Sequence, residues 1–271
     1  MRGVALGALV AVALGPGAAQ RQQQPPTARS NWPCGGRVDP SYFQIAEASG
    51  GDLLMLAPWE IADSAALLQA SSKHPHTIFR LGGTINPGAH EFRVPIDPAV
   101  ESVMFSISVQ CLQTAEVLDP SGQPPSGEGV TDLSNVAERV VIVNRPAAGT
   151  WTIRAAGSGV AGVMVTARTA VSLANVEFAA VGSDRFRPVP VAGVDNIVRI
   201  AVAGRPARVE GAMVNAAAKE IAPLTFAPGD APGVYVSRFT PGSEPFRVLI
   251  RGSDSGGGRF QRVHAPLLTA R

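Results

Sequence analysis

The sequence predicts a mainly β protein with two tandem antiparallel β-sandwiches, immunoglobulin-like or jelly-roll-like, after a short N-terminal α-β-α prelude. Two observations predict this class. Glycine (29) and proline (23) are frequent among the 271 residues, which favours many turns and short strands over long helices. From Thr77 onward, apolar and polar residues alternate with the period of two that places one set of side chains on a core face. The pattern is clearest in residues 101–153, where Val103 and Phe105 alternate with serine and methionine.

The N-terminus has the composition of a secretory signal peptide, which we place at residues 1–19. Arg2 is a short positive region, Val4 to Leu14 form an apolar core, and Gly17 to Ala19 supply small residues for cleavage. The apolar run is too short to span a bilayer comfortably, so we expect a secreted, periplasmic or cell-surface protein with no membrane span after cleavage. Retention of this segment as an N-terminal anchor is the alternative. Residues 20–31 are polar and lack an apolar period, which predicts a disordered lead-in.

The charge of the chain is nearly balanced. Its 23 basic and 21 acidic residues give a formal net charge of +2, which provides no electrostatic reason to expect a nucleic-acid partner or an anionic membrane. A hydrophobic content of 45% excludes general disorder. The sequence leaves the oligomeric state open.

The chain contains two cysteines, Cys34 and Cys111. An oxidising compartment favours a disulfide between them, which would stabilise the fold by about 3–4 kcal/mol and tie the N-terminal segment to the clearest strand. Two separate buried thiols are the alternative. Two cysteines alone cannot form a closed structural zinc site.

The prelude, residues 32–74, is predicted to contain a helix, a strand and a helix: Pro40–Ser49, Leu53–Leu56 and Pro58–Ser71. Asp39 is a candidate N-cap of the first helix, and Gly50 is its stop signal. The apolar spacing in the second helix predicts an inward face: Ile61, Ala65 and Leu68. The short apolar strand needs a neighbour, so it should dock on the first sandwich or pair with another chain.

The first β-sandwich is placed at residues 75–171 and the second at residues 172–271. The strands of the first are predicted at Thr77–Leu81, His90–Val94, Val103–Gln110, Ala115–Leu118, Arg139–Val143, Trp151–Ala155 and Val160–Arg168. The strands of the second are predicted at Asn175–Ala180, Arg187–Val191, Ile197–Val202, Ala207–Val214, Val234–Phe239, Phe246–Arg251 and Phe260–His264.

Several stretches of this chain, in this order, match a known family. FRVPIDPAVESVMFSISVQ, LDPSG and NRPAAGTWTI resemble the β-sandwich that follows the von Willebrand factor A domain in hemicentin-like extracellular proteins. FRPVPVAG, and the stretch from YVSRFTPG to FQRV, resemble the module that comes next in the same proteins. YFQIAEASGG, with the strand and helix after it, is similar to the end of an A domain. The resemblance covers residues 41–264.

The resemblance implies an extracellular, non-catalytic module of the interaction type. In such proteins the A domain carries a D-x-S-x-S loop that holds a divalent cation for ligand binding, and this sequence contains no such motif. Metal-dependent adhesion is therefore carried over to no residue. We assign no catalytic residue, no cofactor and no metal ligand.

Two glycine-rich motifs resemble parts of enzymes. Gly157 to Gly162 fits GxGxxG, but an alternating run follows it where a dinucleotide site needs a helix, so we predict a β-hairpin turn. Ser253 to Gly257 is similar to the nucleophile loop of trypsin-like proteases, but no histidine has a suitable context, so a hairpin turn is again predicted. A hydrolase of unrecognised type that uses Ser255 is the least favoured function.

The remaining polar candidates are interpreted as structural. His74 and His76 would need further metal ligands, and only His90 and Glu91 are near in sequence, so a polar loop is predicted. Five aspartates are interpreted as turn formers, although such turns can bind Ca²⁺: Asp97, Asp119, Asp132, Asp195 and Asp254. Four arginines are interpreted as solvated residues on strand faces: Arg199, Arg208, Arg247 and Arg251.

These observations predict a secreted, non-catalytic β-sandwich protein with a structural or protein-binding role of the adhesion or matrix kind, and not an enzyme. The expected partner is another extracellular protein or a glycan. The alternative is a carbohydrate-binding accessory module of the cell envelope, because sandwiches can present aromatic rings to sugars. The supply of tryptophans for that role is small, since only Trp32, Trp59 and Trp151 are present and Trp151 is assigned to the core.

Overall fold

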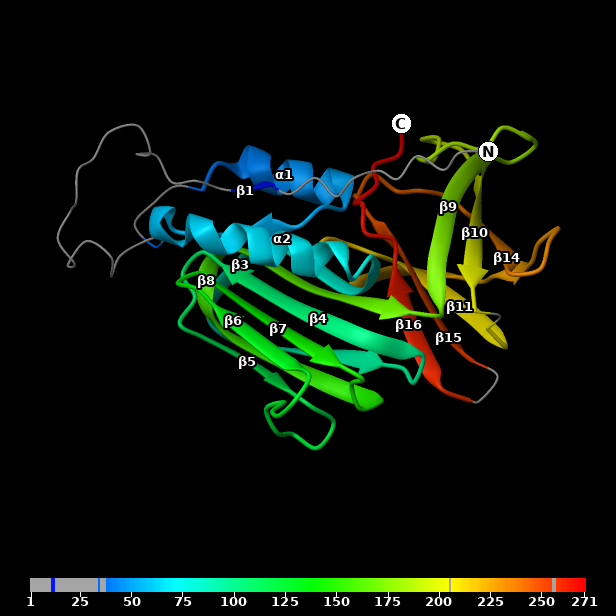
Figure 1. Cartoon of the computed structure of the whole chain (residues 1–271). Coiled ribbons are helices and arrows are strands. Elements are labelled where there is room, and N and C mark those ends of the chain that lie inside the picture. The colour runs from blue at the N-terminus through cyan, green and yellow to red at the C-terminus, as the bar shows by residue number, and fades with distance from the viewer. Residues whose placement is uncertain (1–10, 13–33, 35–37, 205, 255–256) are drawn as a thin grey trace.

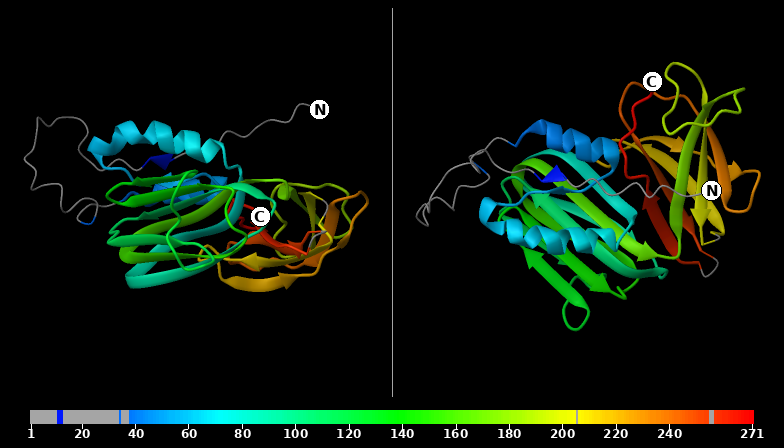
Figure 2. Two further views of the ribbon diagram at one scale, coloured as in Figure 1. Left: turned by 60° about the horizontal axis from the view of Figure 1, so that its bottom comes forward. Right: turned by 45° about the horizontal axis from the view of Figure 1, so that its top comes forward.

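The structure is a computed structural model that describes residues 11–12, 34, 38–204, 206–254 and 257–271. Most of its elements are strands in antiparallel sheets, which confirms the predicted fold class. One six-stranded sheet contains the strands of residues 76–169, and two four-stranded sheets contain those of residues 172–263. Two helices lie over one face of the larger sheet, and the smaller sheets lie at one end of it (Figure 1, Figure 2).

The first helix, α1 (Pro40–Ser49), has the bounds that the sequence predicts. Asp39 caps it by accepting a hydrogen bond from the Ser41 backbone N–H at 2.9 Å, and Pro40 takes the first helical position, where no N–H is needed. Gly50 ends the helix with a φ of 75°, a left-handed conformation that glycine adopts without strain. All three signals are local, which is why the sequence alone locates this helix.

Three short elements follow α1: β2 (Leu53–Leu54), η2 (Pro58–Asp63) and α2 (Ser64–Ser72). The single helix predicted at residues 58–71 is therefore divided into a 3₁₀ turn and an α-helix. The predicted inward face is wrong, because Ile61 is 46% and Leu68 is 38% exposed whereas Leu67 and Ala70 are buried. A 3₁₀ helix has 3.0 residues per turn. An inward face predicted with the 3.6 residues per turn of an α-helix therefore falls on the wrong side of this segment.

The prelude packs on the first set of strands, which is one of the two outcomes expected for its strand. Leu54 and Leu56 are 3% and 0% exposed and cluster with Leu67 of α2. Met104 and Val140 of the underlying sheet complete this cluster. Burial of these apolar side chains gives the prelude a stable position on the sheet.

A two-residue strand, β1 (Ala11–Val12), pairs in parallel register with β2. These residues belong to the apolar part of the predicted signal peptide. The rest of residues 1–19 and the predicted lead-in at residues 20–31 lie outside the described residues. In the part of the chain that the structure describes, no helix is long and apolar enough to cross a membrane.

The larger sheet has the strand order β3-β8-β4-β7-β6, and β5 pairs with β8 outside that path. The bounds are β3 (His76–Ile96), β4 (Val100–Val109), β5 (Thr114–Leu118), β6 (Val130–Ser134), β7 (Glu138–Asn144) and β8 (Gly149–Thr169). Strand β6 was not predicted from the sequence. Strands β3 and β8 are each one strand of 21 residues, where two strands apiece were predicted.

The two long strands pass through both layers of the first sandwich. They pair with each other along most of their length, with a register shift between Ile85 and Gly88. The other edge of β8 is used twice, since residues 161–169 pair with β4 and residues 152–156 pair with β5. The predicted hairpin turn at Gly157–Gly162 is therefore wrong, because these residues continue the strand.

Glycine at position 157 makes room for another part of the backbone. A Cβ atom there would lie 2.5 Å from the Cys111 carbonyl oxygen and 2.9 Å from Val109 Cγ1. The Cys111 N–H donates to the Ser158 carbonyl oxygen at 3.0 Å, so the two segments are hydrogen-bonded at this point. Close approach of two backbones, and not a turn, explains this glycine.

We expect Gly157→Ala to lower the free energy of unfolding by about 1–3 kcal/mol, because the new methyl group must displace the Cys111 carbonyl group. Gly162→Ala in the same strand is the matched control, since no atom lies within 4 Å of its Cβ position. Its expected effect is within about 0.5 kcal/mol. Urea unfolding followed by tryptophan fluorescence measures both variants. Equal destabilisation would contradict the role given to close approach.

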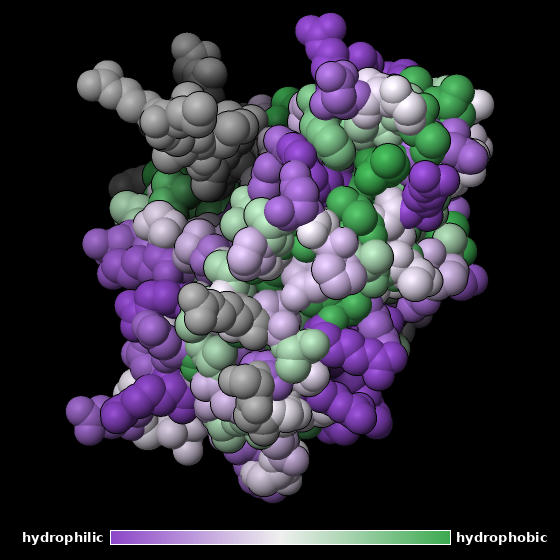
Figure 3. Space-filling model, turned by 90° about the vertical axis from the view of Figure 1, so that its right-hand side faces the viewer, coloured by the Kyte–Doolittle hydropathy of each residue, from purple (hydrophilic) through white to green (hydrophobic). Residues whose placement is uncertain are grey.

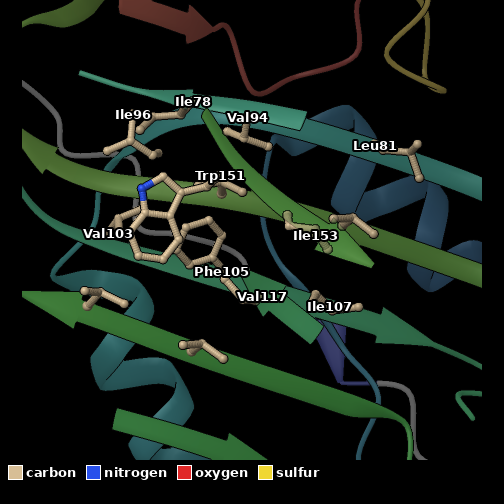
Figure 4. Packing of buried hydrophobic residues seen from close by; sticks show 14 of the residues in the cluster. Ile78, Leu81, Val94, Ile96, Val103, Phe105, Ile107, Val117, Trp151 and Ile153 are labelled. Carbon is tan, nitrogen blue, oxygen red and sulfur yellow. The ribbon is translucent and has the colours of Figure 1, made fainter. Parts of the chain in front are cut away.

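Trp151 lies at the centre of the first core, as predicted from the sequence. It is 1% exposed, and its ring centroid lies 5.2 Å from that of Phe105. Its Nε1–H donates to the Ala147 carbonyl oxygen at 2.9 Å, so the one polar atom of the ring has a partner. Figure 4 shows the two rings together, with Ile107 and Ile153 in the same cluster.

The second set of strands forms two four-stranded sheets, in the orders β13-β14-β10-β9 and β12-β11-β15-β16. The bounds are β9 (Ser172–Ala180), β10 (Asn196–Ala203), β11 (Arg208–Val214), β12 (Glu220–Leu224), β13 (Ala227–Pro228), β14 (Val234–Phe239), β15 (Arg247–Ser253) and β16 (Arg259–Val263). Three rings join the sheets by edge contacts with centroids 5.8 to 6.4 Å apart: Phe178, Phe239 and Phe246.

The prediction of a strand at residues 187–191 is wrong. Among these residues only Arg187 forms a bridge, with Phe178. Pro188 and Pro190 lack the N–H that a longer ladder would need. Strands β12 and β13, which are short and contain proline, were not predicted from the sequence.

Buried polar contacts hold the two sets of strands together. Arg262 of β16 is 1% exposed, pairs with Asp97 at 2.7 Å and donates to the Val171 carbonyl oxygen at 2.7 Å. Gln261 Nε2–H donates to the Ile78 carbonyl oxygen of β3 at 2.9 Å. Because breaking a buried ion pair is costly, these contacts favour one relative position of the two sets.

Candidate functional site

A groove of about 610 Å³ lies in the second sandwich, between the edge strands of its two sheets. Its walls come from β11, β12, the loop after β12, β13, β14 and β15. This volume falls in the range of about 300–1,000 Å³ that is usual for ligand pockets. Figure 3 shows the end of the molecule that the second set of strands forms, where hydrophobic patches lie between hydrophilic ones.

The local sequence explains why the groove is open. Pro223 of β12 and Pro228 of β13 lack the N–H that a further strand would need, so each strand remains an edge. The Phe226 ring, in the loop between them, lies against Gly211 of β11, where a Cβ atom would come within 2.5 Å of the ring. Glycine at this position therefore lets the ring form one wall of the groove.

Two exposed ion pairs lie on the groove. Arg251 pairs with Glu220 at 3.2 Å, and Arg208 pairs with Glu210. All four side chains are roughly half exposed or more, so each pair contributes only about 0–1 kcal/mol to stability. The charges are therefore available to a ligand at little cost to the fold. Their exposure agrees with the prediction that Arg208 and Arg251 are solvated.

The groove is also lined by apolar and aromatic residues. Val209 and Leu224 are 8% and 3% exposed and form the floor, with the half-buried rings of Phe226 and Tyr235 beside them. The Tyr235 hydroxyl donates to the Pro206 carbonyl oxygen at 3.4 Å. The described residues that line the groove include no histidine, cysteine or serine. The arrangement is suited to binding by apolar contact and charge pairing.

Cys34 and Cys111 are joined by a disulfide in the structure, with their Cα atoms 4.9 Å apart. That separation lies within the usual range for disulfides. The bond connects the segment before α1 to the residues just after β4, the strand at which the sequence analysis places the connection.

The predicted histidine loop does not come together with His90 and Glu91. His74 is buried, with Nδ1 2.7 Å from the Ala70 carbonyl oxygen and Nε2 2.9 Å from Ser102 Oγ. Burial is the main cause that lowers the pKa of His74. Within the described ranges, no group of three or more histidine, cysteine, aspartate or glutamate side chains could hold a metal ion.

The aspartates predicted to form turns behave in different ways. Asp119 accepts hydrogen bonds from two backbone N–H groups of its turn, at 2.8 and 3.1 Å. Asp254 begins the turn between β15 and β16, as predicted, and Ser255 lies outside the described residues. The prediction for Asp132 is wrong, because this residue lies in β6 and pairs with Arg139 at 2.6 Å.

A buried ionic cluster of Glu47, Arg80 and Arg247, where the prelude meets both sandwiches, was not predicted from the sequence. Glu47 of α1 is 5% exposed and pairs with Arg80 of β3 at 3.1 Å and with Arg247 of β15. Arg247 is 0% exposed, so its interpretation as a solvated residue is wrong. The available signal was an arginine inside the apolar run Phe246 to Ile250. Its partner lies 200 residues away in the chain and gives no local sign.

The first sandwich matches a family model, and most of the chain matches curated proteins. Residues 70–170 match the model described as hemicentin galactose-binding domain-like. Hemicentin-1 of Mus musculus and hemicentin-1 of Homo sapiens are each 28% identical over 243 residues, which is 82% of this chain and 4% of theirs. The chain therefore spans a small part of the relatives that it matches, and its β-sandwich is hemicentin-like.

A likeness to a solved structure is much weaker. The lipase BlEst2 of Bacillus licheniformis, in its propeptide form, is 15% identical and matches 69% of this chain and 40% of its own. The TM-score is 0.31, which supports no argument about fold or function.

Proposed function

We propose that this chain is a secreted, non-catalytic module that binds another extracellular protein through the groove of its second sandwich, in a structural role of the adhesion or matrix kind. One observation carries the proposal, namely that the groove is lined both by apolar residues and by exposed charges of both signs. A polypeptide segment with acidic and basic side chains can pair with these charges while its apolar side chains cover the floor.

The likeness to hemicentin-1 supports an extracellular setting for this role. In keeping with the resemblance seen in the sequence, the prelude would stand where such proteins end their von Willebrand factor A domain. The disulfide also suits an oxidising, extracellular compartment.

The double variant Arg208→Glu/Arg251→Glu is expected to weaken partner binding at least about ten-fold, because it reverses the positive charges of the groove. The purified full chain would be tested by biolayer interferometry against a panel of purified extracellular-matrix proteins. Arg93→Glu is the matched control, since Arg93 is an exposed arginine of the first sandwich, with 76% side-chain exposure. Absence of saturable binding to the panel, or equal weakening by the control, would count against the proposal.

Carbohydrate binding is the second candidate, and the rings of Phe226 and Tyr235 in the groove favour it. Aromatic rings can stack on sugars while arginine and glutamate side chains bond the hydroxyl groups. A glycan array with the same two variants separates the candidates. The second proposal would replace the first under two conditions. The chain binds a glycan saturably and Arg208→Glu/Arg251→Glu abolishes that binding, and the chain binds no protein of the panel.

A further inference from the structure

Strand β2 is hydrogen-bonded in different ways along its two edges. Alternate residues of a strand direct their backbone groups to opposite edges. Toward the larger sheet, the Leu53 carbonyl oxygen accepts from Ser108 Oγ–H at 2.9 Å. Among the described residues, the only strand that pairs with β2 is β1, on the other edge. The backbone of Leu54 on that edge therefore relies on β1.

The strand that covers this edge lies in the segment predicted to be removed on export. Ala11 and Val12, which pair with Leu53 and Leu54, belong to the predicted signal peptide at residues 1–19. Without them, the backbone groups of Leu54 on that edge lose their strand partner. An open strand edge is a ready template for pairing with another chain, so the edge favours a new occupant.

The prelude, to which β2 belongs, also exposes apolar side chains. The described residues include nine exposed large hydrophobic side chains, and five of them lie in the prelude: Tyr42, Ile45, Trp59, Ile61 and Leu68. Exposed large apolar side chains can contribute contacts to a bound partner. The prelude thus offers an open strand edge and apolar contacts in the same part of the molecule.

We propose that, in the exported protein, an extended apolar segment of a partner polypeptide occupies the position of β1 and pairs in parallel with β2. The strand seated there defines the chemistry of the occupant, which is small, apolar and uncharged at the paired positions. Main-chain hydrogen bonds supply affinity in this mode of recognition, and side-chain pockets supply selectivity. This surface is distinct from the groove of the second sandwich.

The test uses the chain exported by a secretory host, with removal of residues 1–19 checked by intact mass. The probe is a fluorescent peptide of sequence VALGALVAVALG, residues 4–15, with a short lysine tail for solubility. The control peptide is identical except for N-methyl groups on the backbone nitrogens of Ala11 and Val12. Only one of these two adjacent N–H groups can face β2, and methylation of both removes that donor whichever residue supplies it. Fluorescence anisotropy is expected to show saturable binding of the first peptide and at least about ten-fold weaker binding of the second.

Equal binding of the two peptides, or no binding of either, would overturn the proposal, as would an exported chain that retains residues 1–19. The chain without residues 1–19 could also form a dimer in sedimentation experiments. If the peptide dissociates that dimer, the edge is occupied by a second copy of the chain instead. Arg208→Glu/Arg251→Glu should bind the peptide normally, so failure here is distinguishable from failure of the groove proposal.

Discussion

Glu47→Ala is expected to lower the free energy of unfolding by about 3–5 kcal/mol, because it leaves two buried arginines without their shared counter-charge. Arg80 and Arg247 are 5% and 0% exposed, so water cannot replace the carboxylate. The effect should reach all three parts of the molecule, since Glu47 belongs to the prelude and the arginines to the two sandwiches. Urea unfolding of the purified variant measures the loss.

Glu91→Ala is the matched control for the loss of a glutamate that pairs with two arginines. Glu91 pairs with Arg93 at 3.3 Å and with Arg154 at 3.2 Å, but all three side chains are at least 40% exposed. Water can solvate the remaining arginines there, so the expected loss is at most about 1 kcal/mol. If Glu47→Ala does not fold, Glu47→Gln keeps the acceptor oxygen and serves in its place. A Glu47 variant no less stable than Glu91→Ala would refute the importance of the buried cluster.

Glu138→Gln is expected to stabilise the protein at neutral and alkaline pH. Glu138 of β7 is 1% exposed beneath the prelude, and Ser106 Oγ–H donates to its Oε1 at 3.2 Å. Burial is the main cause that raises the pKa of Glu138 from 4.5 to about 8, and the charge of Asp52 adds to it. Below pH 4.5 the folded and unfolded states both hold the proton, so no free energy is lost.

Between pH 4.5 and pH 8 the unfolded chain releases this proton while the folded chain retains it, so stability falls as the pH rises. Glutamine removes this dependence, and its advantage should grow across that window to about 3–5 kcal/mol at pH 8 and above, at about 1.4 kcal/mol per pKa unit. Urea unfolding of both proteins at pH 4, 6 and 8 measures the difference. An advantage that is the same at all three pH values would rule out titration of Glu138 as its cause.

Predictions from the sequence succeeded where the physical cause was local. Asp39 and Gly50 mark the ends of α1 because capping and a left-handed stop involve only neighbouring residues. The alternation of apolar and polar residues in 103–109 identifies β4, because a period of two places every second side chain on the core face of a strand. Trp151 could be assigned to the core for the same reason.

The errors arose where a distant part of the chain decides the local structure. Gly157 has the composition of a turn, but it is a glycine because the Cys111 carbonyl group lies against it. Arg247 has the charge of a surface residue, but Glu47 neutralises it in the interior. The groove was not predicted because it depends on how two edge strands face each other across the second sandwich. None of these relations leaves a periodic signal in the sequence.

The bond between Cys34 and Cys111 also determines how the protein responds to a mechanical pull. A force applied at the N-terminal side passes at Cys34 through a covalent link to Cys111, so it bypasses α1, β2, α2, β3 and β4. The two cysteines are 77 positions apart, and a chain of that length extends to roughly 270 Å at about 3.5 Å per residue. While the disulfide is intact, the residues between the two cysteines cannot be extended by such a force. Reduction of the disulfide would allow this segment to unfold and lengthen under load.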